Sequence, residues 1–136
     1  MDDDFLETLW SQFSVESKEH LDLIEPLLIE AENQGASADA VAQLFRSFHS
    51  LKGLSRAMDF TGMERLAHSA EDLLGLVREG RAPLSPEVVE LLLEGVDNLK
   101  SLRDMALADK VAGPVPADLV GRLDAIVLQF SGGAAG

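Results

Sequence analysis

Residues 45–53 read FRSFHSLKG, and the pattern around them decides the fold. Apolar residues recur there at the spacing of one face of a helix: Val41, Leu44, Phe45, Phe48, Leu51 and Met58. At about 100° per residue this apolar stripe centres near Phe48, which places His49 about 100° round the helix from that centre. The stretch therefore predicts an amphipathic helix that carries a histidine at the boundary between core and solvent.

The composition bounds the classes of protein to which the chain can belong. Its 136 residues are one domain's worth, and a hydrophobic content of 46% is enough for a compact core. The absence of cysteine excludes disulfides, thiolate zinc sites and a cysteine nucleophile. The formal net charge is −13, from 24 acidic and 11 basic residues, and there is no block of lysine or arginine. Nucleic acid is therefore not an expected partner.

The sequence predicts neither a secretion signal nor a membrane span. The N-terminus, MDDDFLETLW, is acidic where a signal peptide is basic. No apolar run approaches the ~20 residues that a membrane helix needs. We therefore expect a soluble, cytoplasmic domain without a membrane partner.

The hydrophobic periodicity predicts five helices and no strand, at about residues 3–32, 38–58, 61–80, 86–108 and 116–130. Ser37 is the expected N-cap of the second helix, and Ser85 followed by Pro86 is expected to cap and open the fourth. Thr61 with Glu64 matches a capping box for the third helix. The predicted fold class is all-α.

Two local features predict how the helices are arranged. Residues 59–61 leave only a tight connection, which forces the second and third helices into an antiparallel hairpin. Pro26 lies within the first helix and predicts a kink near residues 22–25, or a short break. We expect residues 1–130 to form an antiparallel four-helix bundle with an additional fifth C-terminal helix. Residues 131–136, SGGAAG, are the expected start of a flexible linker.

Four polar residues are predicted to meet across this hairpin. His68 and Glu71 share one edge of the third helix at i, i+3 spacing, and that edge can face His49 and Lys52 on the second helix. A carboxylate that accepts a hydrogen bond from one ring nitrogen of His49 fixes the tautomer and leaves the other nitrogen free to attack an electrophile. Lys52, one turn along, can neutralise an anion bound to that nitrogen. The constellation predicts a histidine nucleophile.

Gly53 needs an explanation, because glycine inside a helix costs about 0.5–1 kcal/mol relative to alanine. The position of Gly53 and the helical period support two explanations almost equally. Tight packing against another helix is one, and open access for a second protein to the neighbouring His49 is the other.

The sequence LFRSFHSLKGLSRAM, followed by ERLAHSAEDLLGLVREG, closely resembles the histidine-containing phosphotransfer domain at the N-terminus of the chemotaxis kinase CheA. The resemblance implies that His49 takes the γ-phosphoryl group of ATP on Nε2 from a histidine kinase catalytic domain. It further implies transfer to an aspartate of a CheY-like or CheB-like receiver domain. Glu71 matches the carboxylate that orients the ring through Nδ1, and Lys52 and His68 match the rest of the hydrogen-bond network. Gly53 matches the small residue that clears the approach.

The resemblance also implies what this domain does not do. It is expected to be a monomeric carrier without kinase activity, belonging to a CheA-type histidine kinase. No glycine-rich nucleotide loop is present, so no cofactor is expected on this domain, and ATP and Mg²⁺ belong to its partners. Leu54 and Arg56 depart from the pattern, since small residues often follow the lysine-glycine pair. Arg56 can add positive potential near the phosphoryl group or narrow the choice of partner.

Two other classes of function compete with this interpretation. His49, His68 and Glu71 are the ligand types of a catalytic zinc site. The sequence contains no H-E-x-x-H, and Lys52 would repel a dication, so a metal site is disfavoured. The other class is a helical interaction module that docks a partner through the aromatic start of the first helix, with Phe5, Trp10 and Phe13.

Overall fold

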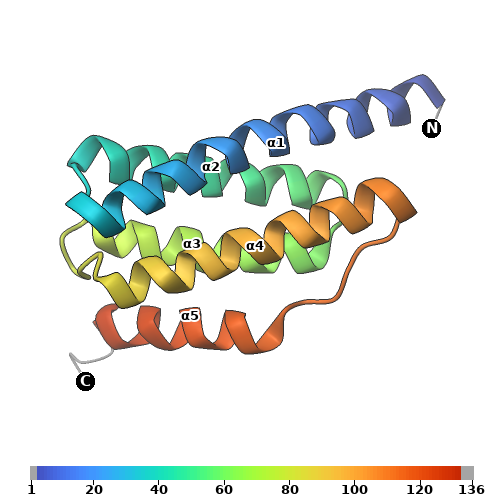
Figure 1. The fold of residues 1–136 in the computed structure, drawn as a ribbon. Helices are drawn as coiled ribbons and strands as arrows, with labels where there is room; N and C mark the ends of the chain where they lie inside the picture. The colour runs from blue at the N-terminus through green and yellow to red at the C-terminus, as the bar shows by residue number, and fades with distance from the viewer. Residues whose placement is uncertain (1–2, 133–136) are drawn as a thin grey trace.

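The computed structural model describes residues 3–132, which form five α-helices and no strand (Figure 1). The helices are α1 (Asp3–Gln34), α2 (Ala38–Ala57), α3 (Thr61–Arg78), α4 (Pro86–Asp109) and α5 (Ala117–Phe130). Successive helices run antiparallel, and α5 lies on the side of α3 and α4 away from α1 and α2 (Figure 1). The predicted four-helix bundle with an additional C-terminal helix is confirmed.

The core of the bundle is centred on the α2–α3 hairpin. Phe48 and Leu51 on α2 and Leu66 and Leu73 on α3 are fully buried. Side chains from the flanking helices close the core, among them Phe13, Ile24 and Leu28 on α1 and Leu92 and Leu99 on α4. Burying each such side chain contributes about 1.5–3 kcal/mol. The apolar stripe of α2 therefore fixes its rotation, and His49 lies at the rim with its side chain 62% exposed.

Two predicted N-caps are confirmed. The Ser37 hydroxyl accepts from the backbone N–H of Ala40 at 3.1 Å, and the Ser85 hydroxyl accepts from that of Val88 at 3.2 Å. These bonds satisfy amides that a helix leaves unpaired at its first turn. The serines thus fix the starts of α2 and α4.

The predicted capping box of the third helix is wrong. Helix α3 begins at Thr61 with Phe60 as its N-cap and no side-chain cap bond. Phe60 is buried and packs edge-on against Phe13, with ring centroids 5.1 Å apart. Glu64 instead accepts from Arg56 on α2 at 2.7 Å. Aromatic packing anchors this end of the hairpin in place of a polar cap.

Helix α1 is continuous through Pro26, so the predicted break is wrong, while a kink within the continuous helix stays a prediction. Pro26 is exposed, and Ile24 and Leu28 on either side of it are fully buried. Their burial holds both halves of the helix to the bundle although proline removes one backbone hydrogen bond. At the other end of the chain, α5 begins at Ala117, one residue later than predicted.

The structure bears on the predicted C-terminal linker and on the expected absence of a membrane span. Helix α5 ends at Phe130, and residues 133–136 of the predicted linker lie outside the described residues. Within residues 3–132, no helix combines the length and the apolar character that crossing a membrane requires.

Candidate functional site

The α2–α3 hairpin brings three of the predicted site residues together. The carboxylate of Glu71 is buried, with only 8% of its side chain exposed, and both of its oxygens are engaged. Its Oε2 is hydrogen-bonded to Nδ1 of His49, and its Oε1 accepts from the Lys52 ammonium at 2.6 Å. One acidic side chain from α3 therefore holds two side chains that lie one turn apart on α2.

The electrostatics of this trio determine which ring nitrogen is available. Burial alone would raise the pKa of Glu71, but hydrogen bonds from Lys52 and His49 outweigh it and hold that pKa below its ordinary value. An ionised carboxylate only accepts hydrogen bonds, so Nδ1 of His49 is the donor. A neutral imidazole with its proton on Nδ1 carries its lone pair on Nε2. The arrangement thus presents a nucleophilic nitrogen on an exposed side chain.

The surroundings of Gly53 decide between the two explanations of that residue. A Cβ built on Gly53 meets no atom within 4 Å, and the residue is exposed. Tight helix packing is therefore excluded as the reason for this glycine. Open backbone one turn after His49 is consistent with close approach of a second molecule.

A groove between α1 and α2 lies beside this open backbone. Its volume is about 330 Å³, and it is lined by Leu9, Gln12, Phe13 and Glu16 on α1, by Ser50, Gly53, Leu54 and Ala57 on α2, and by Met58 at the C-cap of α2. Leu54, one of the two residues after the lysine-glycine pair that depart from the family pattern, contributes apolar surface to this groove. The other, Arg56, is paired with Glu64 at 2.7 Å, so a carboxylate on α3 partly neutralises its charge.

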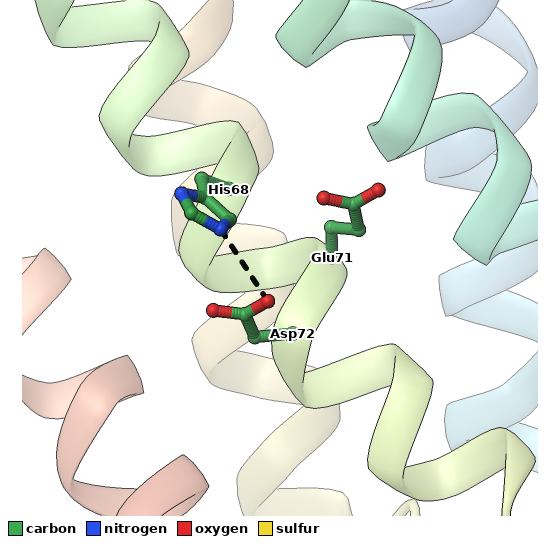
Figure 2. A group of neighbouring side chains, drawn as sticks. All are labelled: His68, Glu71 and Asp72. Carbon is green, nitrogen blue, oxygen red and sulfur yellow. Dashed lines mark ion pairs between the residues drawn. The ribbon is translucent and has the colours of Figure 1, made fainter.

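His68 lies next to the trio but has a different partner. Its Nε2 is 3.6 Å from Oδ1 of Asp72, four residues along α3. Figure 2 shows this pair on one flank of α3, while the carboxylate of Glu71 points toward α2. The role of His68 in the network around His49 stays a prediction. Asp72 was not predicted as a partner, although its i+4 spacing from His68 is a readable signal.

The predicted metal ligand set is not the one that comes together. Among residues 3–132, the group with suitable spacing is His68, Glu71 and Asp72, whose ligand atoms lie within 4.8 Å of one another (Figure 2). His49 is not part of it. Glu71 already accepts from an ammonium at 2.6 Å, and a dication there would be repelled by that charge.

The predicted aromatic docking face at the start of α1 is largely used by the fold. Phe13 is only 1% exposed, and Trp10 packs against Phe60 with ring centroids 5.7 Å apart. The Lys110 ammonium lies 4.1 Å from the centroid of the Trp10 ring. These contacts assign two of the three aromatic residues to the bundle itself.

An aromatic side chain that the sequence pattern assigned only to the apolar stripe of α2 lies beside the ring of His49. Phe45, one turn earlier on α2, lies nearly parallel to it, with centroids 6.4 Å apart and 14° between the planes. The Arg78 guanidinium covers the Phe45 ring at 4.0 Å, and the absence of a side chain at Gly75 leaves room for that ring. Phe45 thus joins His49 to a cation on α3.

Fold and site together define an all-α bundle domain with an exposed histidine whose Nδ1 is held by a buried carboxylate. The family model described as "Hpt domain" matches residues 8–102. The chain therefore belongs to the Hpt domain family, the histidine phosphotransfer domains.

Individual relatives agree with this assignment. The chain is 32% identical over 124 residues to the chemotaxis protein CheA of Halobacterium salinarum, covering 91% of this chain and 18% of that protein. It is 32% identical over 90 residues to the CheA of Bacillus subtilis, covering 66% of this chain and 13% of the relative. The chain thus spans less than a fifth of either relative.

A solved structure is similar over nearly the whole chain. It is the phosphorylated P1 domain of CheA3 in complex with CheY6 from R. sphaeroides, with a TM-score of 0.83 and 30% sequence identity. The match covers 90% of this chain and 98% of the solved one. The likeness thus extends beyond the matched family range to most of the five-helix fold.

Proposed function

We propose that this domain carries a phosphoryl group on His49, between the catalytic domain of a histidine kinase and the aspartate of a response-regulator receiver domain. The observation that carries the proposal is the contact of His49 with Glu71: Nδ1 of His49 donates to a buried, ionised Glu71, and the side chain that carries Nε2 is 62% exposed. Membership of the Hpt family and likeness to a phosphorylated P1 domain support it.

Both transfers follow from this geometry. The Nε2 lone pair of His49 attacks the γ-phosphorus of ATP, the N–P bond forms, the bridging P–O bond breaks, and ADP leaves with that electron pair. The ring gains positive charge, which the Glu71 carboxylate stabilises through Nδ1. Lys52, held against Glu71 at 2.6 Å, is positioned to stabilise the anionic phosphoryl group. In the second step an aspartate oxygen attacks phosphorus, and the N–P electron pair returns to Nε2.

The domain acts as substrate and carrier, and the kinase activity belongs elsewhere. ATP and one Mg²⁺ are supplied by the kinase domain and a second Mg²⁺ by the receiver, so this domain needs no cofactor of its own. Similarity to CheA proteins of which it spans less than a fifth supports a place within a larger CheA-type kinase in the cytoplasm. His68, beside the trio, is proposed to support the network around Glu71.

The receiver is proposed to dock over His49 and the groove between α1 and α2. Leu54 and Met58 give the groove apolar surface, and the bare backbone of Gly53 lets a partner approach the ring. The complex of the similar P1 domain with CheY6 supports a CheY-like partner. NMR shifts on adding a receiver should cluster on these residues of α1 and α2, and shifts confined to α4 and α5 would contradict this surface.

The proposal is tested by phosphorylation with a CheA kinase catalytic domain, ATP and Mg²⁺. The wild-type domain should acquire an acid-labile, base-stable label, as phosphohistidine does. His49→Gln should abolish the label and leave the helical circular dichroism unchanged, because the side chain is 62% exposed. His20→Gln, a histidine on α1, is the matched control and should keep the label. A label retained by His49→Gln would move the phosphorylation site elsewhere.

A further inference from the structure

The basic residues of this chain are almost all paired. Within residues 3–132, ten of the 11 lysines and arginines have a carboxylate, a hydroxyl or an aromatic ring as partner, so one cation is left over. That cation is Arg46, for which the structure gives no hydrogen bond, ion pair or ring contact. In a chain with 24 acidic residues, carboxylate partners are abundant. A cation without a partner of any of these kinds is therefore an exception that needs a reason.

The sequence around Arg46 keeps carboxylates away from it. On a helix the neighbours of a side chain are the residues three and four positions away. For Arg46 these are Ala42, Gln43, His49 and Ser50, and none is acidic. Elsewhere the chain uses this spacing for pairing, as in Lys18 with Asp22 at 2.6 Å and Arg122 with Asp118 at 3.1 Å.

Arg46 lies on the same exposed ridge as the phosphoacceptor. Arg46, His49, Gly53 and Ala57 are all exposed and fall within about 80° of arc on α2, at roughly 100° per residue. Lys52 is turned instead toward α3, where Glu71 holds it. A protein that reaches His49 from solvent therefore meets the unpaired guanidinium on one side of the ring and the bare backbone of Gly53 on the other.

The negative charge of the rest of the molecule makes the positive charge of Arg46 important for an acidic partner. With a net charge of −13, the chain repels an acidic partner from most directions. A receiver presents an aspartate together with the carboxylates that hold its Mg²⁺. A guanidinium that has no partner among residues 3–132 can pair with such a carboxylate without first breaking an ion pair within the bundle. A rim charge of this kind acts mainly on the association rate and on its dependence on salt.

We propose that Arg46 is the specificity residue that admits acidic receiver domains to His49, by pairing with a carboxylate at the rim of the receiver's phosphoacceptor site. The inference rests on the proposed function, since it concerns the second of the two phosphoryl transfers. Arg46 assists encounter and orientation, and the chemical step remains with His49, Lys52 and the receiver's aspartate.

The test measures transfer from labelled domain to a receiver at increasing receiver concentration. The domain is loaded by a CheA kinase domain and purified, and CheY6 from R. sphaeroides serves as the receiver probe. Arg46→Gln should lower kcat/KM at low ionic strength by about three- to ten-fold, a rim-charge effect, with the maximal rate at saturating receiver unchanged. Arg46→Glu should lower kcat/KM further, and Arg46→Lys should restore most of it. Near 1 M salt, where the Debye length is about 3 Å, the variants should converge.

The matched control is Arg122→Gln, which removes one positive charge on α5 and should leave the transfer unchanged. An equal fall in the maximal rate at saturating receiver and in kcat/KM would show that Arg46 acts on the phosphoryl group in the transition state, and it would overturn the proposal. Equal kinetics for Arg46→Gln and wild type would overturn it too, while leaving the proposed function intact. Absence of any transfer from labelled wild-type domain to CheY6 would contradict the receiver step itself, and Arg46 with it.

Discussion

Glu71 is the side chain on which the proposed reactivity of His49 should depend. It fixes one ring nitrogen as a donor and holds the Lys52 ammonium with its other oxygen, at 2.6 Å. Because it is buried and comes from α3, it is rigid relative to the exposed ring that it orients. Removing it changes the tautomer balance and the position of the cation together, but it does not remove the nucleophile.

Replacement of Glu71 by alanine should therefore slow phosphorylation without abolishing it. We expect the rate to fall by about ten- to a hundred-fold, the range seen when a carboxylate that orients a histidine ligand is lost. The measurement is the initial rate of label incorporation from a kinase domain and ATP. Glu79→Ala, a carboxylate at the C-cap of the same helix, is the control and should react like wild type. An unchanged rate for Glu71→Ala would remove this residue from the mechanism.

The same carboxylate should make stability depend on pH. The pKa of Glu71 is lowered in the fold, since hydrogen bonds from Lys52 and His49 outweigh the opposing effect of burial. The folded state then binds fewer protons than the unfolded state, so the stabilisation is present above the ordinary value of about 4.5 and is lost as the pH falls through the lower folded pKa. Urea unfolding of wild type and Glu71→Gln should show an advantage for wild type at pH 7 that shrinks between about pH 5 and pH 3. An advantage that is constant over this range would contradict the pairing.

At the scale of the helix, we expect Gly53 to lower the stability of α2 and to give a partner access to His49. A Cβ at this position meets nothing within 4 Å, so Gly53→Ala should raise the free energy of unfolding by about 0.5–1 kcal/mol. It should also slow transfer to a receiver, because the methyl group stands on the ridge beside His49. Gly121→Ala on α5 also meets nothing within 4 Å and should stabilise to a similar degree without changing transfer. Equal transfer rates for the two variants would show that Gly53 has no role in access.

The boundaries of the elements show where sequence patterns succeed. Ser37 and Ser85 were predicted as caps because a serine before a helix has a local partner, the amide three residues along, and both bonds form. The break at Pro26 and the capping box at Thr61 were predicted wrongly, because contacts between residues far apart in the sequence decide the structure at both positions. Burial on both sides of Pro26 keeps α1 continuous, and aromatic packing of Phe60 fixes the start of α3.

The candidate site, like the helix boundaries, was predictable only where local spacing determines the contact. The trio of His49, Lys52 and Glu71 was predicted because helical spacing and a tight hairpin determine which edges meet, and the structure brings all three together. The partner of His68 was not predicted, because two carboxylates, Glu71 and Asp72, follow it closely on α3 and spacing alone does not choose between them. The stacking of Arg78 on Phe45 joins two helices through side-chain directions that a single sequence does not specify.

At the scale of the whole molecule, the candidate site lies on one side of the bundle and α5 lies on the other. The side formed by α1 and α2 carries the exposed histidine, the groove and the unpaired Arg46, whereas α5 covers the opposite side (Figure 1). Helix α5 is attached to α3 by Asp124, which binds Arg65 and accepts from the Ser69 hydroxyl at 2.8 Å. These contacts lie on the flank of α3 that does not face His49, so α5 is expected to stabilise the scaffold without touching the reacting groups.

Deletion of residues 111–136 should therefore lower the stability of the bundle and leave the labelling of His49 intact. The deletion removes three buried side chains, Leu119, Val120 and Leu123, each contributing about 1.5–3 kcal/mol, so the Tm should fall. The helical circular dichroism of α1–α4 and the labelling of His49 should persist, because every residue of the trio lies on α2 or α3. If the truncated chain does not fold, Leu123→Ala, at a cost of about 2–5 kcal/mol, makes the same comparison within the full chain. Loss of labelling in a variant that retains its helical signal would show that α5 controls the site, and this division of the bundle would then be wrong.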